Sequence, residues 1–373
     1  MNAPLSGNAA LRHVEALDGV RGLAVLLVLL FHGFAVSADG CGATTMRALF
    51  SPGWLGVDLF FVLSGFLITG ILARTRAAPG YFRSFYTRRA LRIFPAYFAV
   101  LGFALLIYPH FNATLAQSDA GRYALPLALF AQNWVTALTG HKPGWPGLDH
   151  FWSLHVEEQF YLFWPLLVWL TPARWLARLC LAMFGASVLL KLELAAHHAG
   201  WSLIYLWTPS RLEGLAAGAY LAGRGDRTWP RGMFALPLAA VALALIVLLR
   251  WGTSLYDPHV LALLIPAATV LFAALLDRAR RPGAVANLFS ARWLTYLGRR
   301  SYGLYLIHWV LYYQVAGWVY ARTEALPAAA RALLMGGAVI ALTLLAAELM
   351  FRAIEAPALR LKRFAPVPAA RSV

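Results

Sequence analysis

The sequence predicts an all-α polytopic membrane protein, a bundle of about ten transmembrane helices in one domain over residues 1–373. Three observations predict this class. Hydrophobic residues make up 61% of the 373 positions. Charged residues make up only 13%, whereas a soluble domain has about 25%. Apolar runs near the ~20 residues that a transmembrane helix needs recur from residue 17 to residue 351, without a long polar interval.

Eleven of these apolar runs are candidate spans. The first is expected to remain as a helix, because Arg21 lies inside it and no small-residue cleavage site follows it, as one would in a secretory signal peptide. In chain order the candidate spans are 17–37, 54–73, 93–109, 122–138, 154–171, 177–195, 203–223, 233–250, 259–276, 302–320 and 332–351.

Segments rich in basic residues give the expected orientation. They are 74–92, 277–300 and the segment after residue 351, and the positive-inside rule assigns all three to the cytoplasm. The short tails 1–16 and 352–373 are then both cytoplasmic. Eleven crossings cannot satisfy that arrangement, so one run must fail to span.

The run 122–138 is the weakest candidate span. It is short and carries Pro126, Gln132 and Asn133. Removing it leaves about ten crossings, with residues 110–153 as an external or re-entrant excursion.

Charge and cysteine content exclude two classes of function. The formal net charge of +16 would suggest nucleic acid in a soluble protein, but here the basic residues gather at helix ends, where a membrane protein needs them. The two cysteines, Cys41 and Cys180, cannot build a disulfide framework or a metal cluster. We therefore expect no nucleic-acid partner and no metal.

Two ionisable residues share one face of the first predicted helix. Arg21 and His32 are eleven residues apart, which on an α-helix is about 20° beyond three turns and about 16 Å along the axis. Ionisable groups in lipid seek partners or water, so this stripe is expected to face the bundle interior. Asp18 lies close enough to pair with Arg21. The alternative is an interfacial arginine and a buried structural histidine.

The second predicted helix adds a carboxylate. Asp58 lies a few residues into it, at a depth close to that of His32, and a carboxylate beside an imidazole raises its basicity and fixes its tautomer. The alternative is that Asp58 caps the helix at the interface. Gly56, Ser64 and Gly65 would allow tight helix packing.

A series of motifs resembles the acyltransferase 3 family of integral membrane O-acyltransferases. After the arginine and histidine of the first helix, the motifs are GVDLFFVLSGFLIT at 56–69, FYTRRALRIFPAY at 85–97, FWSLHVEEQFYLFWP at 151–165, SRLEGLAAGA at 210–219, SYGLYLIHW at 301–309 and Glu355-Ala356-Pro357. They occur in order over nearly the whole chain.

The resemblance implies a bundle of about ten helices in the bacterial inner membrane. Such a protein passes acyl groups, usually acetyl, from cytosolic acyl-CoA to hydroxyls on cell-surface glycans, or less often to other acceptors. It also implies the stand-alone form, without an esterase-like domain after the last helix. No permanently bound cofactor is expected, and acetyl-CoA would serve as the donor substrate. The expected partners are acyl-CoA, a glycan or lipid-linked sugar, and membrane lipids.

The donor site implied by the resemblance is cationic. Acyl-CoA carries phosphates, and arginine binds phosphate in a bidentate fork. Arg88, Arg89 and Arg92 offer such forks, and Arg89 and Arg92 share a helix face. Arg21, which is deeper, would contact the donor nearer its thioester. The alternative is that these arginines are topology signals.

The base for acyl transfer is expected to be His32. The acceptor hydroxyl must lose a proton as it attacks the thioester carbonyl, and a group with a pKa near neutrality suits that task. A transient acyl-histidine is equally possible chemically. Asp58 is its expected partner.

The fifth candidate span supplies expected acceptor contacts. HVEE at 155–158 is not the HExxH zinc pattern, so metal hydrolysis has no support. Glu157 is expected to orient the acceptor or hold a cation at the outer end of this helix, and it matches the family position more closely than Glu158 does. Gln159 and Tyr161 could bind sugar hydroxyls.

Several other polar residues receive mostly structural interpretations. His308 belongs to an inward polar stripe and could contact substrate or serve as a structural histidine. Arg211 is expected to pair with Glu213, and Glu355 with Arg352. The remaining cases are His197 and His198, expected to be solvent-exposed, and the sequon at 112–114, a frequent chance match.

A transporter remains the alternative function. Arg21, His32, Glu157 and His308 could line a substrate or proton path. For the enzyme, the acceptor stays open among lipopolysaccharide O-antigen, exopolysaccharide, peptidoglycan, a lipid-linked sugar and a small metabolite. The acyl length and the oligomeric state also stay open.

Overall fold

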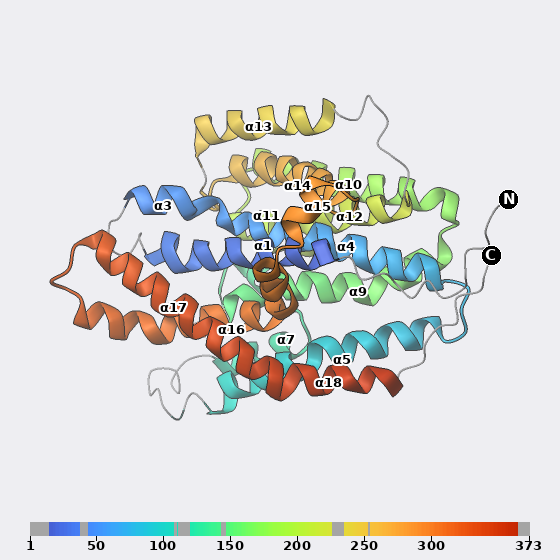
Figure 1. The fold of residues 1–373 in the computed structure, drawn as a ribbon. Helices are drawn as coiled ribbons and strands as arrows, with labels where there is room; N and C mark the ends of the chain where they lie inside the picture. The colour runs from blue at the N-terminus through green and yellow to red at the C-terminus, as the bar shows by residue number, and fades with distance from the viewer. Residues whose placement is uncertain are drawn as a thin grey trace.

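Helices are the only regular secondary structure in the described part of the chain. The computed structural model describes residues 15–37, 44–107, 110, 120–142, 147–225, 235–252 and 254–364, and every regular element within these ranges is a helix (Figure 1). The predicted all-α class is therefore confirmed for these residues.

The elements follow one another with short connections. The α-helices are α1 Glu15–Leu30, α3 Thr44–Phe50, α4 Gly56–Thr75, α5 Tyr81–Gly102, α7 Ala120–Ala128, α8 Gln132–Thr139, α9 Trp152–Leu170, α10 Ala173–Ala196, α11 Trp201–Leu206, α12 Leu212–Gly223, α13 Ala235–Trp251, α14 Ile265–Ala279, α15 Ala284–Phe289, α16 Arg292–Arg322, α17 Ala328–Met350 and α18 Ala356–Arg360. The π-helical segments are η1 Phe31–Val36, η3 Phe103–Ile107, η8 Val260–Leu264 and η9 Phe351–Glu355, and the 3-10 segments are η2 Ser51–Leu55, η5 Asp149–Phe151, η6 Thr208–Arg211 and η10 Leu361–Phe364.

Within the described ranges, six helical segments are long and apolar enough to cross a membrane. They are Glu15–Val36, Thr45–Thr75, Tyr81–Ile107, Ala173–Ala196, Val260–Ala279 and Ala328–Phe364. The count of about ten crossings is therefore not confirmed. The candidate span 203–223 is broken into α11, η6 and α12, and α13 is only 17 residues long. Polar residues such as Glu157 and Glu158 in α9 also lower the hydropathy of helices in the bundle.

The run 122–138 forms two short helices, as its composition suggested. The chain breaks between α7 and α8 at Phe130, which has a positive φ of 53°. Gln159 of α9 donates a hydrogen bond of 2.6 Å to the Phe130 carbonyl and so holds this turn. Helices of 9 and 8 residues reach only about 12–14 Å each, too short to cross a bilayer.

Helix α5 begins earlier than expected. The predicted span started at residue 93, but the helix starts at Tyr81, directly after Gly80, whose φ is 72°. The arginine-rich stretch therefore continues into the apolar part as one helix. This rigid continuation carries Arg89 and Arg92 toward the interior of the bundle.

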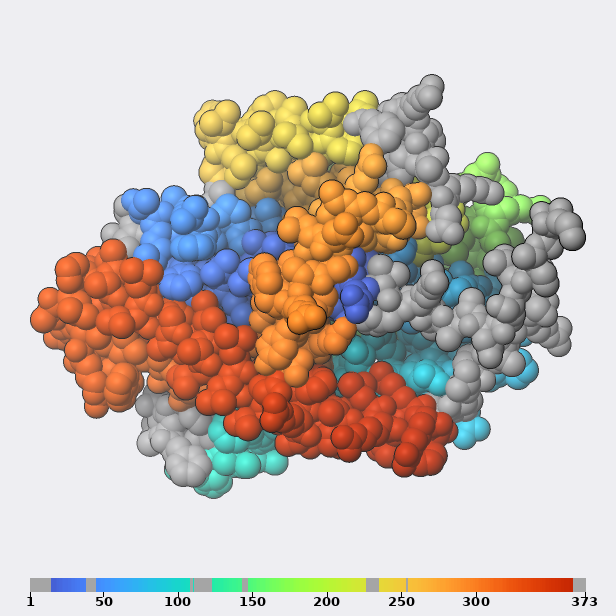
Figure 2. Space-filling view, in the orientation of Figure 1, coloured from blue at the N-terminus to red at the C-terminus, as the bar shows by residue number. Residues whose placement is uncertain are grey.

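Helix α1 lies at the centre of the bundle. It packs against α4 and α16, and in Figure 2 the segment with α15 and the start of α16 lies over it. The contact with α16 is very close, because a Cβ added to Gly298 would lie 1.8 Å from the Asp18 carbonyl oxygen. Only glycine permits this approach, so the position of α16 relative to α1 depends on it.

A second close contact joins α4 to α12. A Cβ on Gly65 would lie 1.9 Å from the Leu215 carbonyl oxygen, and one on Gly218 would lie 1.8 Å from the Val62 carbonyl oxygen. The expected packing role of Gly65 is confirmed. Gly56 has the same role toward α1, where its added Cβ would lie 2.5 Å from the Ala24 carbonyl oxygen.

Gly65→Ala should destabilise the protein. The added methyl group meets backbone rather than a flexible side chain, and such overpacking costs at least about 1–3 kcal/mol. The thermal unfolding midpoint in detergent should fall. Gly70→Ala in the same helix is the control, because its nearest neighbour is the Arg74 side chain at 3.5 Å. Equal midpoints for both variants would contradict this account.

Candidate functional site

Two cavities lie next to each other in the bundle. The first, here called the arginine cavity, has a volume of about 80 Å³ and is lined by Arg21, Arg89 and Arg92. The second, the histidine cavity, has a volume of about 320 Å³ and is lined by His32 and His150. The sequence placed Arg21 and His32 on one stripe of the first helix, and the structure puts them in adjacent cavities.

The arginine cavity gathers cations from two helices. Arg21 comes from α1, and Arg89 and Arg92 come from one face of α5. Arg21 also pairs with Asp18 at 3.4 Å, as expected. The Arg89 guanidinium lies 4.4 Å from the centre of the Tyr161 ring, and its Nε is buried without a hydrogen-bond partner. Donors of this kind can bind an anion such as phosphate.

Arg88 does not line the arginine cavity. It lies next to Arg89 in sequence, so its side chain points about 100° away around α5. The structure therefore brings Arg89 and Arg92 together with Arg21 but leaves Arg88 apart, and phosphate binding by these arginines stays a prediction.

Glu157 lies in the arginine cavity, with Glu158 and Tyr161. Ser64 donates a hydrogen bond of 2.7 Å to Glu157 Oε1, and the Tyr161 hydroxyl lies 3.1 Å from Glu157 Oε2. This placement agrees with the expected alternative that a glutamate holds a cationic partner, and contact with the acceptor stays a prediction. Helix α9 turns this face toward the arginines of α5, so the glutamates balance the cationic cavity.

His32 lies where α1 changes to the π-helical segment η1, a distortion that often marks functional sites. Its Nδ1 is 3.0 Å from the Val28 carbonyl oxygen. A carbonyl can only accept, so Nδ1 carries the proton and Nε2 is the unprotonated nitrogen. The Trp309 ring lies 4.4 Å from the imidazole and holds its plane.

His308 lies behind His32 and does not line either cavity. Its Nδ1 donates to the Tyr305 carbonyl oxygen at 2.7 Å, which leaves Nε2 as an acceptor 3.3 Å from His32 Nδ1. The inward orientation expected for His308 is confirmed. Direct substrate contact is not supported, because His308 is fully buried and lines neither cavity.

A third histidine was missed by the sequence analysis. His150 of η5 lines the histidine cavity, and its ring centre lies 4.8 Å from that of His308. Its Nε2 donates to the same Tyr305 carbonyl oxygen at 2.8 Å. The only signal in the sequence was a histidine just before the FWSLHVEE motif.

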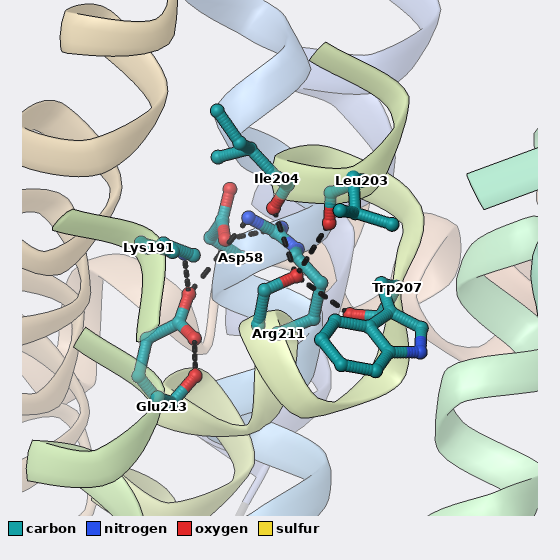
Figure 3. Close-up of polar contacts among 9 residues, drawn as sticks. Asp58, Lys191, Leu203, Ile204, Trp207, Arg211 and Glu213 are labelled. Atoms are coloured by element: carbon teal, nitrogen blue, oxygen red, sulfur yellow. Dashed lines mark hydrogen bonds and ion pairs between the residues drawn. The ribbon is translucent and has the colours of Figure 1, made fainter. Parts of the chain in front are cut away.

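Asp58 does not pair with His32. Arg211 Nη2 donates a hydrogen bond of 2.6 Å to Asp58 Oδ1, and both side chains are fully buried (Figure 3). The expected carboxylate–imidazole pair is therefore wrong. A guanidinium carries a full charge and a neutral imidazole does not, so Arg211 is the stronger partner for a buried carboxylate.

Asp58 belongs to a buried network of two carboxylates and two cations. Arg211 also lies 3.8 Å from Glu213, as expected, and Glu213 accepts hydrogen bonds from Lys191 and from Ser187. The charges of Asp58, Glu213, Arg211 and Lys191 sum to zero. Lys191 was missed, although a lysine inside an apolar run is itself a signal.

The network supports the wall of the histidine cavity. The Arg211 guanidinium lies 5.5 Å from the Trp152 ring centre and 4.9 Å from that of Tyr205, and both aromatic residues line the cavity. Asp58 therefore acts on the cavity through Arg211 and these rings.

Comparison with known proteins gives the family. A family model described as an acyltransferase domain matches residues 14–348. The chain belongs to the acyltransferase 3 family. No solved structure matches it.

Bacterial relatives of this acyltransferase 3 chain carry related names. It is 30% identical over 331 residues to a Bacillus subtilis protein provisionally named a peptidoglycan O-acetyltransferase, covering 80% of this chain and 48% of the relative. It is 28% identical over 366 residues to the peptidoglycan O-acetyltransferase OatA of Listeria monocytogenes, covering 93% and 56%. The chain thus spans about half the length of these relatives. No comparison favours the transporter alternative.

The histidine cavity of this acyltransferase 3 member is mostly aromatic. Trp201, Tyr205, Tyr256 and Tyr312 line it with Trp309. Asp149 accepts a hydrogen bond of 2.6 Å from Trp309 Nε1 and fixes that ring beside His32. Burial raises the pKa of Asp149, while Lys142 and the Trp309 bond act in the opposite direction. Among the described residues, no group of three His, Cys, Asp or Glu side chains could hold a metal.

Several remaining expectations have clear outcomes. Gln159 holds the α7–α8 turn instead of facing a cavity. Arg352 pairs with Glu348 at 2.7 Å, so the expected Arg352–Glu355 bridge is wrong. His197 and His198 are exposed. Cys41 and the sequon at 112–114 lie outside the described residues.

Lys191→Met should destabilise the protein strongly. It leaves two buried carboxylates with one cation, and breaking a buried pair costs about 3–5 kcal/mol. The thermal unfolding midpoint in detergent measures the effect. The double variant Lys191→Met/Glu213→Gln keeps the charges balanced and should regain much of the loss. A double variant less stable than Lys191→Met would refute this description of the network.

Proposed function

We propose that this protein is a membrane O-acyltransferase that moves an acyl group, most simply acetyl, from cytosolic acyl-CoA to a glycan hydroxyl. The observation that carries the proposal is the pair of adjacent cavities, one with arginines and the other with a histidine whose Nε2 is unprotonated. Family membership and the names of the relatives support the same activity.

The donor would bind at the arginine cavity. Arg89 and Arg92 would hold the phosphates of acyl-CoA in bidentate fashion, and Arg21 would lie nearer the thioester. Glu157 and Glu158 would keep the arginines apart and oriented when no donor is bound. This assigns the arginine cavity to the cytosolic side of a bacterial inner membrane, with both termini in the cytoplasm.

The acceptor would bind at the histidine cavity. Tryptophan and tyrosine present flat apolar faces together with polar edges, which suits a ring that carries both C–H groups and hydroxyls. The relatives named for peptidoglycan make a peptidoglycan-type glycan the favoured acceptor.

His32 would act as the general base. Its Nε2 takes the proton of the acceptor hydroxyl while that oxygen attacks the thioester carbonyl carbon. The C–O bond forms, the C–S bond breaks, and the protonated imidazole returns the proton to the departing CoA thiolate. The products are the ester and CoA thiol, and no nucleotide is consumed.

The activity can be tested with purified protein in liposomes. Given acetyl-CoA labelled in the acetyl group and peptidoglycan fragments, the protein should form a base-labile labelled ester on the glycan. His32→Ala should abolish ester formation, because a general base contributes roughly 10²–10⁴-fold to the rate. Correct insertion of the variant in liposomes is the control. An inserted His32→Ala protein with undiminished turnover would remove the assignment.

His308 would be a positioning residue that acts through His32. Its Nε2 lies 3.3 Å from His32 Nδ1 and shares the Nδ1 proton with the Val28 carbonyl, so His308→Leu should lower kcat by up to about a hundredfold, within the range of a general base. The KM values for donor and acceptor should stay nearly unchanged. His308→Gln keeps an acceptor and a donor and should restore part of kcat. A change in KM alone would contradict a positioning role.

A further inference from the structure

The two cavities share only two lining residues in the described chain, Val57 and Tyr305. Val57 is 7% exposed and Tyr305 is 6% exposed. These side chains therefore form a thin partition between the arginines and His32. Any group that passes from one cavity to the other must pass the Tyr305 ring.

The Tyr305 side chain contacts residues on both sides of the partition. Its hydroxyl lies 2.5 Å from Ser153 Oγ, which lines the arginine cavity, and donates to the carbonyl oxygen of His150 at 3.0 Å. Phe60, which lines the arginine cavity, packs edge-on against the same ring at 6.2 Å. The closed position is thus held by hydrogen bonds and by packing.

The backbone of the same residue orients the histidines. The Tyr305 carbonyl oxygen accepts from His308 Nδ1–H and from His150 Nε2–H. His150 therefore contacts Tyr305 twice. The His150 carbonyl oxygen accepts from the Tyr305 hydroxyl, and His150 Nε2 donates to the Tyr305 carbonyl oxygen. Because His150 lines the histidine cavity, a molecule that displaces it there would also loosen the hydroxyl of Tyr305.

We propose that Tyr305 makes the reaction specific for the glycan hydroxyl over water. This inference rests on the proposed acyltransferase function. With the partition closed, a thioester held at the arginines has no path to the water of the larger cavity. An acceptor that fills the histidine cavity and displaces His150 would open the partition and exclude water at the same time.

Loss of the partition should permit a defined side reaction. A water molecule activated by His32 Nε2 attacks the thioester carbonyl carbon, the C–O bond forms and the C–S bond breaks. The proton taken by His32 passes to the thiolate, so the products are acetic acid and CoA thiol. Water is the only co-reactant.

The test compares thiol release without acceptor and ester formation with acceptor, for the full chain in liposomes given acetyl-CoA. Tyr305→Phe keeps the ring but loses both hydroxyl contacts, so acceptor-independent thiol release should rise at least about three- to tenfold, the factor that a single hydrogen bond contributes. Tyr305→Ala should give a larger rise, and Tyr305→Ala/His32→Ala should abolish it. Tyr296→Ala is the matched control, because this exposed tyrosine of α16 lines neither cavity.

The outcomes separate the two proposals. The role of Tyr305 is overturned if the unmodified protein forms ester but, without acceptor, Tyr305→Phe and Tyr305→Ala release CoA thiol no faster than the unmodified protein does. If no protein forms ester, the proposed function itself fails. Should Tyr305→Ala not fold, Tyr305→Phe and Ser153→Ala decide, since both keep the ring; the first removes both contacts of the hydroxyl and the second only the contact with Ser153.

Discussion

The arrangement of the site depends on the neutral network of Asp58, Arg211, Glu213 and Lys191. Buried charges are tolerated inside a membrane bundle only when they are paired, and these four connect α4, η6, α12 and α10. The same guanidinium lies among aromatic rings that line the histidine cavity. The same four residues therefore balance the buried charge and, through Arg211, support the wall of the proposed acceptor site.

The two cavities separate groups that would interfere with each other. A base near arginines would lose basicity, because neighbouring positive charge disfavours protonation of an imidazole. The structure keeps Glu157 and Glu158 with the arginines, and among the described residues His32 contacts neutral groups of Val28, Phe31, His308 and Trp309. Tyr305 lies between the charged residues of the arginine cavity and the neutral surroundings of His32, and it lines both cavities.

The sequence predicted those features that depend on a single helix. Arg21 and His32 follow from helical periodicity, and so do the shared face of Arg89 and Arg92 and the Asp18–Arg21 pair, because their geometry is local. Partners on different helices could not be predicted. Asp58 and Arg211 are 153 residues apart, and a depth argument places Asp58 near His32 without saying which way either side chain points.

Helix α1 and its continuation η1 carry Arg21 and His32, one residue of each cavity, and under the proposed function their spacing limits the kind of donor that can react. On a helix, eleven steps from Arg21 to His32 measure about 16 Å. Under the proposed function, a donor whose phosphates bind at Arg89 and Arg92 would therefore have to present its reacting carbon at the end of a long, thin arm that extends past Arg21. The pantetheine arm of acyl-CoA, the donor in the proposed function, has this form. The spacing between Arg21 and His32 is therefore consistent with a thioester on an extended carrier.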